Sequence, residues 1–183
     1  MIFETERLIF RKPIKQDFTR FWQMLNDPIA KKYTGGVTKL SYQQRLALFE
    51  QECLEDFSTQ GAEFAAIEKE SGNYQGYCGF PYSEQLCGCE FLFGYCRDCW
   101  RKGYATESAQ SVLNILFETY CHDVYIATVS PQNTASKRVL EKVGFVRVGD
   151  YPISSIETAE KFQLDKQNFR YRHPERYFHV GIQ

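Results

Sequence analysis

The sequence predicts a mixed α/β fold in which short strands alternate with amphipathic helices. The helical signal is clearest at 103–120, and strand-like runs at 62–67 and 75–82 flank the turn-forming segment Ser71–Gly72–Asn73, which suits an antiparallel hairpin. The 183 residues, 43% of them hydrophobic, suffice for one sizeable core and are too few for two. We therefore expect a single domain spanning 1–183.

In the N-terminal third, residues 7–11 alternate like a strand. Apolar residues then recur at helical spacing until Pro28 stops the run. Residues 31–39 contain two consecutive glycines and no period, which predicts a loop, and Ser41 is a suitable N-cap for a second helix. This part of the chain is expected to be a strand followed by two helices.

After the hairpin, the sequence predicts a third strand at 89–96 that leads into the 103–120 helix. That helix carries a broad apolar stripe of Ala105, Ala109, Val112, Leu113, Leu116 and Phe117. A buried strand is expected at 124–129, then a helix from Asn133 that ends at Gly144, a strand at 145–148 and a weaker one at 162–164. Residues 168–183 show no clear period, and we expect a tail packed on the surface.

Charge and hydropathy exclude several classes of partner. Twenty-two basic and 23 acidic residues give a net charge of -1, which offers no electrostatic footprint for nucleic acid. No run of apolar residues is long enough for a membrane span, and the first ten residues lack the pattern of a secretory signal. We expect a cytoplasmic protein without a membrane partner.

Seven cysteines are an odd number, which argues against a disulfide framework. The spacing Cys87-x-Cys89 followed by Cys96-x-x-Cys99 is compatible with structural zinc. The stronger interpretation is that these are reduced packing residues, because Cys89 lies in an apolar strand pattern and only six residues separate the pairs. We therefore predict no metal and keep a zinc-stabilised interaction domain as the weakest alternative.

The segment 90–108 carries the most chemical information. An apolar strand runs into Arg101-Lys102-Gly103-Tyr104-Ala105 and then directly into a helix. The first amides of a helix lack internal partners and lie at the positive end of its dipole, and small residues let a phosphate approach the backbone. The pattern favours an anion site, although an ordinary solvated turn has the same composition.

Three segments together resemble the GNAT acetyltransferases: Thr5-Glu6-Arg7-Leu8, Trp100 through Glu107, and Asn133 through Phe145. Within that superfamily, the likeness is closest to the Rim-type enzymes (RimJ and RimL) that acetylate the N-termini of ribosomal proteins. It covers the chain best over 5–151, and the three motifs in this order are more specific than any one of them.

The resemblance implies a strongly twisted, mixed and mostly antiparallel sheet of about six to seven strands, with helices on both faces and two central strands that splay apart. It implies acetyl-CoA as co-substrate, with the pantetheine arm paired to backbone groups of Phe93, Gly94, Tyr95 and Cys96. The diphosphate would be held by Trp100, Arg101, Lys102, Gly103, Tyr104, Ala105 and Thr106. Asn133 would contact the pantetheine amide, cap its helix, or do both.

Attack by an amine on a thioester requires a neutral nucleophile, so an alkyl ammonium must lose a proton. In the Rim-type enzymes a carboxylate stands where Glu90 stands here, and Glu90 is our candidate base; its alternative is a solvent-facing edge residue. An amide near Phe93 would stabilise the oxyanion. Leu140 takes the place of the tyrosine that protonates the leaving thiolate in many relatives, so Ser136 is either the acid or only a cap residue.

These inferences predict an N-acetyltransferase that works by direct transfer in a ternary complex, with a non-catalytic acyl-CoA sensor as the alternative. The acceptor stays open between a peptide N-terminus, such as that of a ribosomal protein, and a small-molecule amine. Specificity is expected to come from 28–39 and 150–160, where Asp150, Glu157 and Glu160 would attract a cation. The oligomeric state, monomer or homodimer, is also open.

Overall fold

The computed structural model describes residues 2–54, 61–119, 123–154, 157–169 and 178–180. Its main sheet has six strands in the order β11-β1-β2-β3-β4-β7, and every neighbouring pair is antiparallel. These strands are β1 (Ile2–Glu4), β2 (Leu8–Arg11), β3 (Glu63–Glu68), β4 (Tyr74–Gly79), β7 (Leu92–Tyr95) and β11 (Phe178–Val180). A second, three-stranded sheet has the order β8-β10-β9, with β8 (Val124–Val129), β9 (Val146–Pro152) and β10 (Thr158–Asp165).

The two sheets meet at one point and then diverge. Glu90 and Ile126 form an isolated parallel bridge, in which the Phe91 amide donates to the Ile126 carbonyl over 2.6 Å. Among the described strands, no ladder joins β7 to β8 beyond this bridge. One edge of β7 therefore stays open, as the splayed pair in the sequence-based prediction requires.

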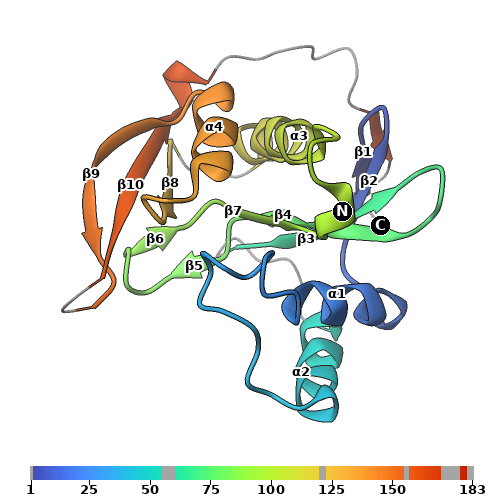
Figure 1. The fold of residues 1–183 in the computed structure, drawn as a ribbon. Coiled ribbons are helices and arrows are strands. Elements are labelled where there is room, and N and C mark those ends of the chain that lie inside the picture. Colours follow the sequence, from blue (N-terminus) through green and yellow to red (C-terminus); the bar gives the residue numbers. More distant parts are fainter. Residues whose placement is uncertain (1, 55–60, 120–122, 155–156, 170–177, 181–183) are drawn as a thin grey trace.

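Helices cover both faces of the main sheet (Figure 1). α1 (Phe18–Leu25) and α2 (Tyr42–Leu54) lie on the side that we call the lower face, and α3 (Tyr104–Thr119) and α4 (Thr134–Val143) lie on the upper face. Short 3-10 turns precede α1 (Lys15–Asp17), follow β7 (Arg97–Cys99) and follow β10 (Lys166–Asn168). Among the described helices, none combines the length and the apolar character that a membrane crossing requires.

The core is aromatic on both sides of the sheet. On the upper face Phe117 of α3 packs edge-on against Tyr125 of β8, with ring centroids 5.1 Å apart. On the lower face Phe21 of α1 stacks on Phe49 of α2 at 4.9 Å. Aromatic pairs of this geometry add to the hydrophobic gain from burial. Phe21 also packs edge-on against Tyr74 of β4 at 6.2 Å, so both helix layers are fixed to strands.

The structure confirms the hairpin and corrects two strand predictions. Gly72 adopts a positive φ of 69° and closes the turn between β3 and β4. The strand expected at 89–96 is interrupted. Its first part is β6 (Gly88–Cys89), which pairs with β5 (Tyr82–Ser83). The chain then forms the Glu90–Ile126 bridge before β7 begins. The C-terminal segment, expected to be an irregular tail, contributes β11 as an antiparallel edge strand beside β1.

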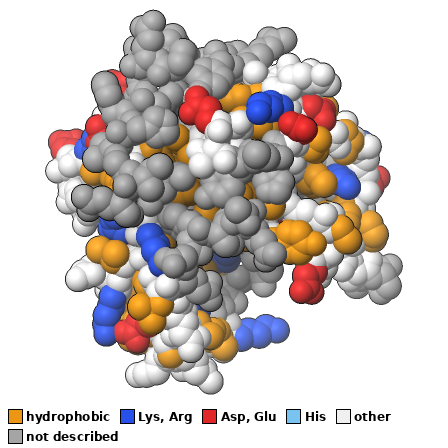
Figure 2. All heavy atoms as spheres, turned by 180° about the vertical axis from the view of Figure 1, so that it is seen from behind, with side chains coloured by type: hydrophobic (Ala, Val, Ile, Leu, Met, Phe, Trp, Pro, Cys, Tyr) orange, Lys and Arg blue, Asp and Glu red, His pale blue; other side chains and the backbone are white. Residues whose placement is uncertain are grey.

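Charge is distributed without one dominant sign. On the side of the molecule seen in Figure 2, acidic and basic side chains alternate over the described surface. This matches the net charge of -1.

Candidate active site

The anion site predicted from the sequence lies between β7 and α3. Arg101 and Gly103 both have a positive φ, of 64° and 87°. An alternation of left-handed and ordinary backbone conformations turns successive amides toward one concavity, which is a recurrent geometry for binding anions. A left-handed backbone is favourable for glycine, which accounts for Gly103. It is uncommon for a residue with a side chain such as Arg101.

Several backbone amides in this turn are free to bind a ligand. The amides of Thr106 and Glu107 both donate to the Gly103 carbonyl over 3.1 Å. Within the described residues, the five preceding amides have no acceptor: Arg101, Lys102, Gly103, Tyr104 and Ala105. They precede or open a 16-residue helix, at the positive end of its dipole, so this corner fits a diphosphate. The Thr106 amide is already used, so any contact made by Thr106 would come from its hydroxyl.

A clamp from the N-terminal strand region holds this turn in place. Glu107, in the first turn of α3, accepts from the Thr5 hydroxyl (2.5 Å), from the Arg7 amide (3.1 Å) and from the Arg7 guanidinium (2.8 Å). Arg7 also donates to the Lys102 carbonyl over 2.8 Å. The Thr5–Arg7 motif thus fixes the helix start, a role that sequence reasoning did not assign to it or to Glu107.

Tyr104 anchors the other side of the turn. Its hydroxyl donates to Glu68 at the end of β3, and the Arg7 guanidinium carbon lies 4.7 Å from its ring centre. The hydrogen bond to Glu68 raises the pKa of Tyr104 to about 12. The hydrogen bonds from Ser71 and then from Tyr104 lower the pKa of Glu68. The phenol therefore stays neutral and the carboxylate stays charged across the physiological range.

The open edge of β7 presents alternate backbone groups. The Phe91 amide points away from β4 to Ile126, whereas the Cys96 amide donates to Gln75 on β4 over 2.8 Å. By alternation, the amides of Phe93 and Tyr95 point into the gap beside β8. The sequence predicted that backbone groups of all four residues from Phe93 to Cys96 would be available to a ligand. The structure leaves only the amides of Phe93 and Tyr95 available, because those of Gly94 and Cys96 face β4.

The side chains of Trp100 and Tyr77 both contact the backbone of β7. The Trp100 indole Nε1 donates to the Tyr95 carbonyl over 2.9 Å, so the tryptophan that precedes the turn occupies one backbone acceptor of β7. A Cβ on Gly94 would lie 2.7 Å from the Tyr77 ring, closer than atoms approach. Gly94 therefore lets Tyr77 of β4 lean across to β7.

Glu90 lies where β7 and β8 meet. It is half-buried, and its carboxylate accepts a hydrogen bond from the Thr128 hydroxyl at 2.5 Å. Tyr125 of β8 faces α3, so by alternation Thr128 faces the lower side of the sheet, and Glu90 with it. The candidate base thus lies at the point where the strands separate.

On α4 the structure supports capping roles. The Asn133 side chain accepts from the Ser136 amide over 3.2 Å as the N-cap. The Ser136 side chain is half-buried, and its hydroxyl makes no hydrogen bond within the described residues. Leu140 is buried in the core. Lys137 binds Glu160 and the Pro131 carbonyl, so it is held by the protein itself.

The cysteine pairs take part in packing and local hydrogen bonds. The Cys99 thiol donates to the Gln75 side chain over 2.6 Å, and Cys87 lies exposed in the β5–β6 turn. Within the described ranges, no group of three or more acidic, cysteine or histidine side chains is arranged to hold a metal.

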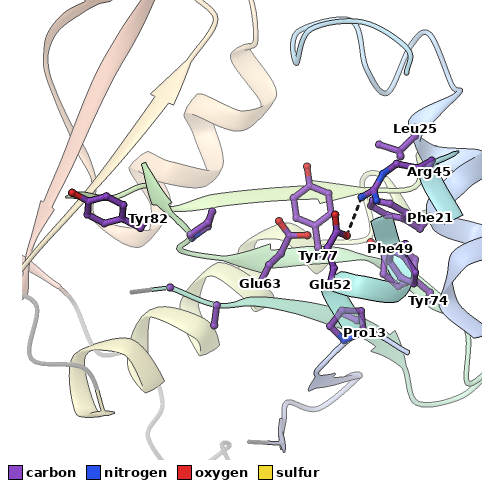
Figure 3. A pocket seen from close by; sticks show the side chains of 14 residues that line it. Pro13, Phe21, Leu25, Arg45, Phe49, Glu52, Glu63, Tyr74, Tyr77 and Tyr82 are labelled. Atoms are coloured by element: carbon purple, nitrogen blue, oxygen red, sulfur yellow. Dashed lines mark hydrogen bonds and ion pairs between the residues drawn. The ribbon is translucent and has the colours of Figure 1, made fainter. Parts of the chain in front are cut away.

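Sequence reasoning missed a cavity of about 410 Å³ on the lower face, which we call the α2 cavity. Figure 3 shows Glu63 and Tyr77 of the sheet facing Arg45, Phe49 and Glu52 of α2 across it. Its lining residues come from α1, α2, β3, β4 and the adjoining segments: Pro13, Phe21, Leu25, Arg45, Phe49, Glu52, Gly61, Ala62, Glu63, Ala65, Tyr74, Tyr77, Pro81 and Tyr82. No single segment contains enough of them to reveal the cavity in the sequence.

The charges in this cavity are unevenly paired. Arg45 forms an ion pair with Glu52 at 3.0 Å, and its Nη1 is buried without a partner among the described residues. Glu63 makes no hydrogen bond or ion pair to any described residue, although it is open to solvent through the cavity. The surrounding walls, and secondarily Glu52, raise the pKa of Glu63 to about 7.

Comparison with known proteins agrees with these features. The family model of the acetyltransferase (GNAT) domain matches residues 7–146. An uncharacterized N-acetyltransferase, p20 of Bacillus licheniformis, is 30% identical over 148 residues, which is 79% of this chain and 82% of that protein.

Solved structures show the same fold. A GNAT-family acetyltransferase from Bacillus anthracis superimposes with a TM-score of 0.77 at 24% identity, over 91% of this chain and 99% of that one. The spermidine N-acetyltransferase of Vibrio cholerae, solved with CoA and spermine, gives a TM-score of 0.73 at 14% identity, over 88% of this chain and 96% of that one.

Proposed function

The chain belongs to the GNAT family of acetyltransferases, and on that premise we propose that it transfers the acetyl group of acetyl-CoA to a primary amine by direct attack in a ternary complex. One observation carries the proposal: five consecutive amides without acceptors, from Arg101 to Ala105, lie at the start of α3 and adjoin the open edge of β7. That combination fits a diphosphate followed by an extended amide-bearing arm.

The residues present suit acetyl-CoA, which supplies an activated acetyl thioester when bound. Backbone amides of the loop from Trp100 to Ala105 would hold the diphosphate, and Arg101 and Lys102, both exposed, would add positive charge. The amides of Phe93 and Tyr95 would pair with the pantetheine arm, and one of them, which we assign to Phe93, would donate to the thioester oxygen during attack. Asn133 serves as the cap of α4.

Glu90 would act as the base for the attacking amine. A carboxylate fixed by Thr128 beside the open strand edge can accept the proton of an alkyl ammonium directly or through one water. General base catalysis of this kind contributes about 10²–10⁴-fold in rate. Ser136, whose hydroxyl makes no bond to a described residue, is our candidate donor on α4 for the leaving thiolate.

Two classes of acceptor are supported, one by the sequence motifs and the other by the similarity in fold. The Rim-type motif pattern supports a peptide N-terminus, whereas the fold likeness to the spermidine enzyme supports a small amine. Both belong in one screen, which measures release of free CoA from acetyl-CoA with peptides, polyamines and aminoglycosides. We expect turnover with at least one class and CoA binding by calorimetry. Binding without turnover across the panel would instead support the acyl-CoA sensor, and absence of binding at millimolar CoA would refute both.

A further inference from the structure

The α2 cavity and Glu90 lie on the same face of the sheet. Glu63, Tyr77 and the residues of α1 and α2 line the cavity on the lower face. Thr128 holds Glu90 on that same side. The cavity wall also includes Pro81, whose carbonyl accepts from the Glu90 amide over 3.0 Å. The cavity therefore adjoins the segment between β6 and β7 that carries the candidate base.

The lining of the cavity suits a positively charged ligand. Two carboxylates, Glu52 and Glu63, and one guanidinium, Arg45, line it. Arg45 is paired with Glu52, whereas Glu63 forms no ion pair with a described residue and only feels the more distant charges of Arg45 and Lys31. Aromatic rings complete the wall, among them Tyr74, Tyr77 and Tyr82. A carboxylate among aromatic faces is the surrounding that an alkyl ammonium prefers.

The register of the sheet sets the distance between this charge and the open edge. Glu63 of β3 is paired with Gly79 of β4, which is paired with Leu92 of β7. Because β4 lies between β3 and β7, the backbone at Glu63 is two inter-strand spacings, or about 10 Å, from the backbone of β7. Glu90 lies two residues before Leu92, on the lower face. An amine held at Glu63 is thus too far from the β7 edge to be the amine that attacks there.

The side of the cavity nearest Glu90 is formed by Pro81. Tyr77 is paired with Ala65 of β3 and with Gly94 of β7, so from the level of Glu63, Gly79 and Leu92 it lies in the direction away from Glu90. Pro81 belongs to the cavity wall, and its carbonyl accepts from the Glu90 amide. A flexible chain that starts at Glu63 and passes Pro81 therefore leads toward Glu90.

We propose that the acceptor is a linear aliphatic diamine or polyamine, with one ammonium bound by Glu63 in the α2 cavity and a second amine delivered to Glu90 at the edge of β7. This proposal rests on the proposed acetyl transfer. The reacting ammonium gives one proton to Glu90, and its nitrogen forms a bond to the acetyl carbonyl carbon. The carbon–sulfur bond then breaks, and the second proton that the nitrogen loses passes to the departing thiolate, so CoA is released as the free thiol. The ammonium at Glu63 keeps its charge throughout.

Binding at Glu63 should depend on pH. The groups that act on Glu63 are Glu52, which raises its pKa, and Arg45 and Lys31, which lower it. With a pKa of about 7, Glu63 gains its charge as pH rises from 6 to 8, while the distal ammonium stays protonated. The KM for a diamine should therefore fall over this range, and Glu63→Gln should remove that dependence.

The test compares diamines from diaminopropane to diamino-octane with monoamines of the same length, using CoA release at saturating acetyl-CoA. We expect kcat/KM to rise with diamine length toward the members that span the two carboxylates, and to exceed that of the matched monoamine by about 10-fold or more. Glu63→Gln should raise the KM of the best diamine about 10-fold and leave its kcat, and all monoamine rates, nearly unchanged. Glu70→Gln, an exposed change in the β3–β4 turn, is the control.

Each outcome has a distinct meaning. Turnover of peptides or monoamines without dependence on diamine length, or with no effect of Glu63→Gln, would overturn the diamine site and leave the acetyltransferase proposal standing. No turnover with any amine would count against both. Unchanged CoA binding by the variant shows that Glu63→Gln is folded, so a lost diamine preference is then specific to the cavity.

Discussion

The α3 corner and the α2 cavity lie on opposite sides of the same strands and are built in different ways. The α3 corner, from Arg101 to Ala105, presents main-chain amides of one short segment that have no acceptor among the described residues. The cavity is formed by side chains of two helices, three strands and the segments between them, and its carboxylate without an ion-pair partner among the described residues is that of Glu63. The first suits the diphosphate of acetyl-CoA and the second suits the distal ammonium of a diamine, which are the two ligands that we propose.

The largest expected effect is on kcat and comes from a change at Glu90, which we place between the α3 corner and the α2 cavity. Glu90→Gln should lower kcat about 10²–10³-fold, because the amide cannot accept the proton of the ammonium. The affinity for CoA, which depends on the α3 corner, should stay the same by calorimetry. Glu84→Gln in the β5–β6 turn is a matched control, since its side chain is exposed and nearby in sequence. An unchanged kcat for Glu90→Gln would exclude Glu90 as the base.

The next effect tests whether the corner depends on its clamp. Glu107→Gln weakens the contacts to Thr5 and Arg7, and hydrogen bonds to a charged group contribute about 1.5–3 kcal/mol. We expect a lower free energy of unfolding by about that amount and a CoA affinity reduced about 10-fold. Both are measured by denaturant titration and calorimetry. If stability falls and CoA affinity does not, the clamp supports the fold without shaping the anion site.

The sequence predicted the anion site of the α3 corner but not the α2 cavity, and the reason is physical. A glycine, basic neighbours and a helix start are contiguous in the sequence, and so is the Asn133 cap with Gly144 in the left-handed C-cap conformation. Local chemistry determines such features. Glu63 has the pattern of an ordinary strand residue. Its place in a cavity depends on Glu52 and Tyr77, which only the tertiary fold brings near it.

The same distinction explains the strand errors. The bridge at Glu90 and the pairing of β11 with β1 are long-range contacts that no local pattern encodes. The apolar run at 89–96 read as continuous because the hydrophobic pattern continues through the turn. The role of Arg7 was missed for this reason too, because its partner Glu107 is 100 residues away.

A smaller effect compares one strained backbone position in the corner with one outside it. Gly103→Ala and Gly72→Ala each place a side chain at a positive φ, of 87° and 69°, which costs about 1–2 kcal/mol of stability. Gly103→Ala should also reduce CoA affinity about 10-fold, because strain of that size would alter the amide array. Gly72→Ala should leave CoA affinity unchanged. Equal affinities for the two variants would show that the turn geometry is unimportant for binding.

The smallest effect concerns Trp100, where the corner meets the open edge. Trp100→Phe keeps an aromatic ring and removes the Nε1 donor to the Tyr95 carbonyl, a neutral hydrogen bond of about 0.5–1.5 kcal/mol near the surface. If the indole fixes the end of β7 for the pantetheine arm, the KM for acetyl-CoA should rise a few-fold at unchanged kcat. If the indole instead occupies an acceptor that the arm would use, the variant should bind acetyl-CoA more tightly. Steady-state kinetics with acetyl-CoA as the varied substrate distinguishes the two, because only the sign of the change in KM differs.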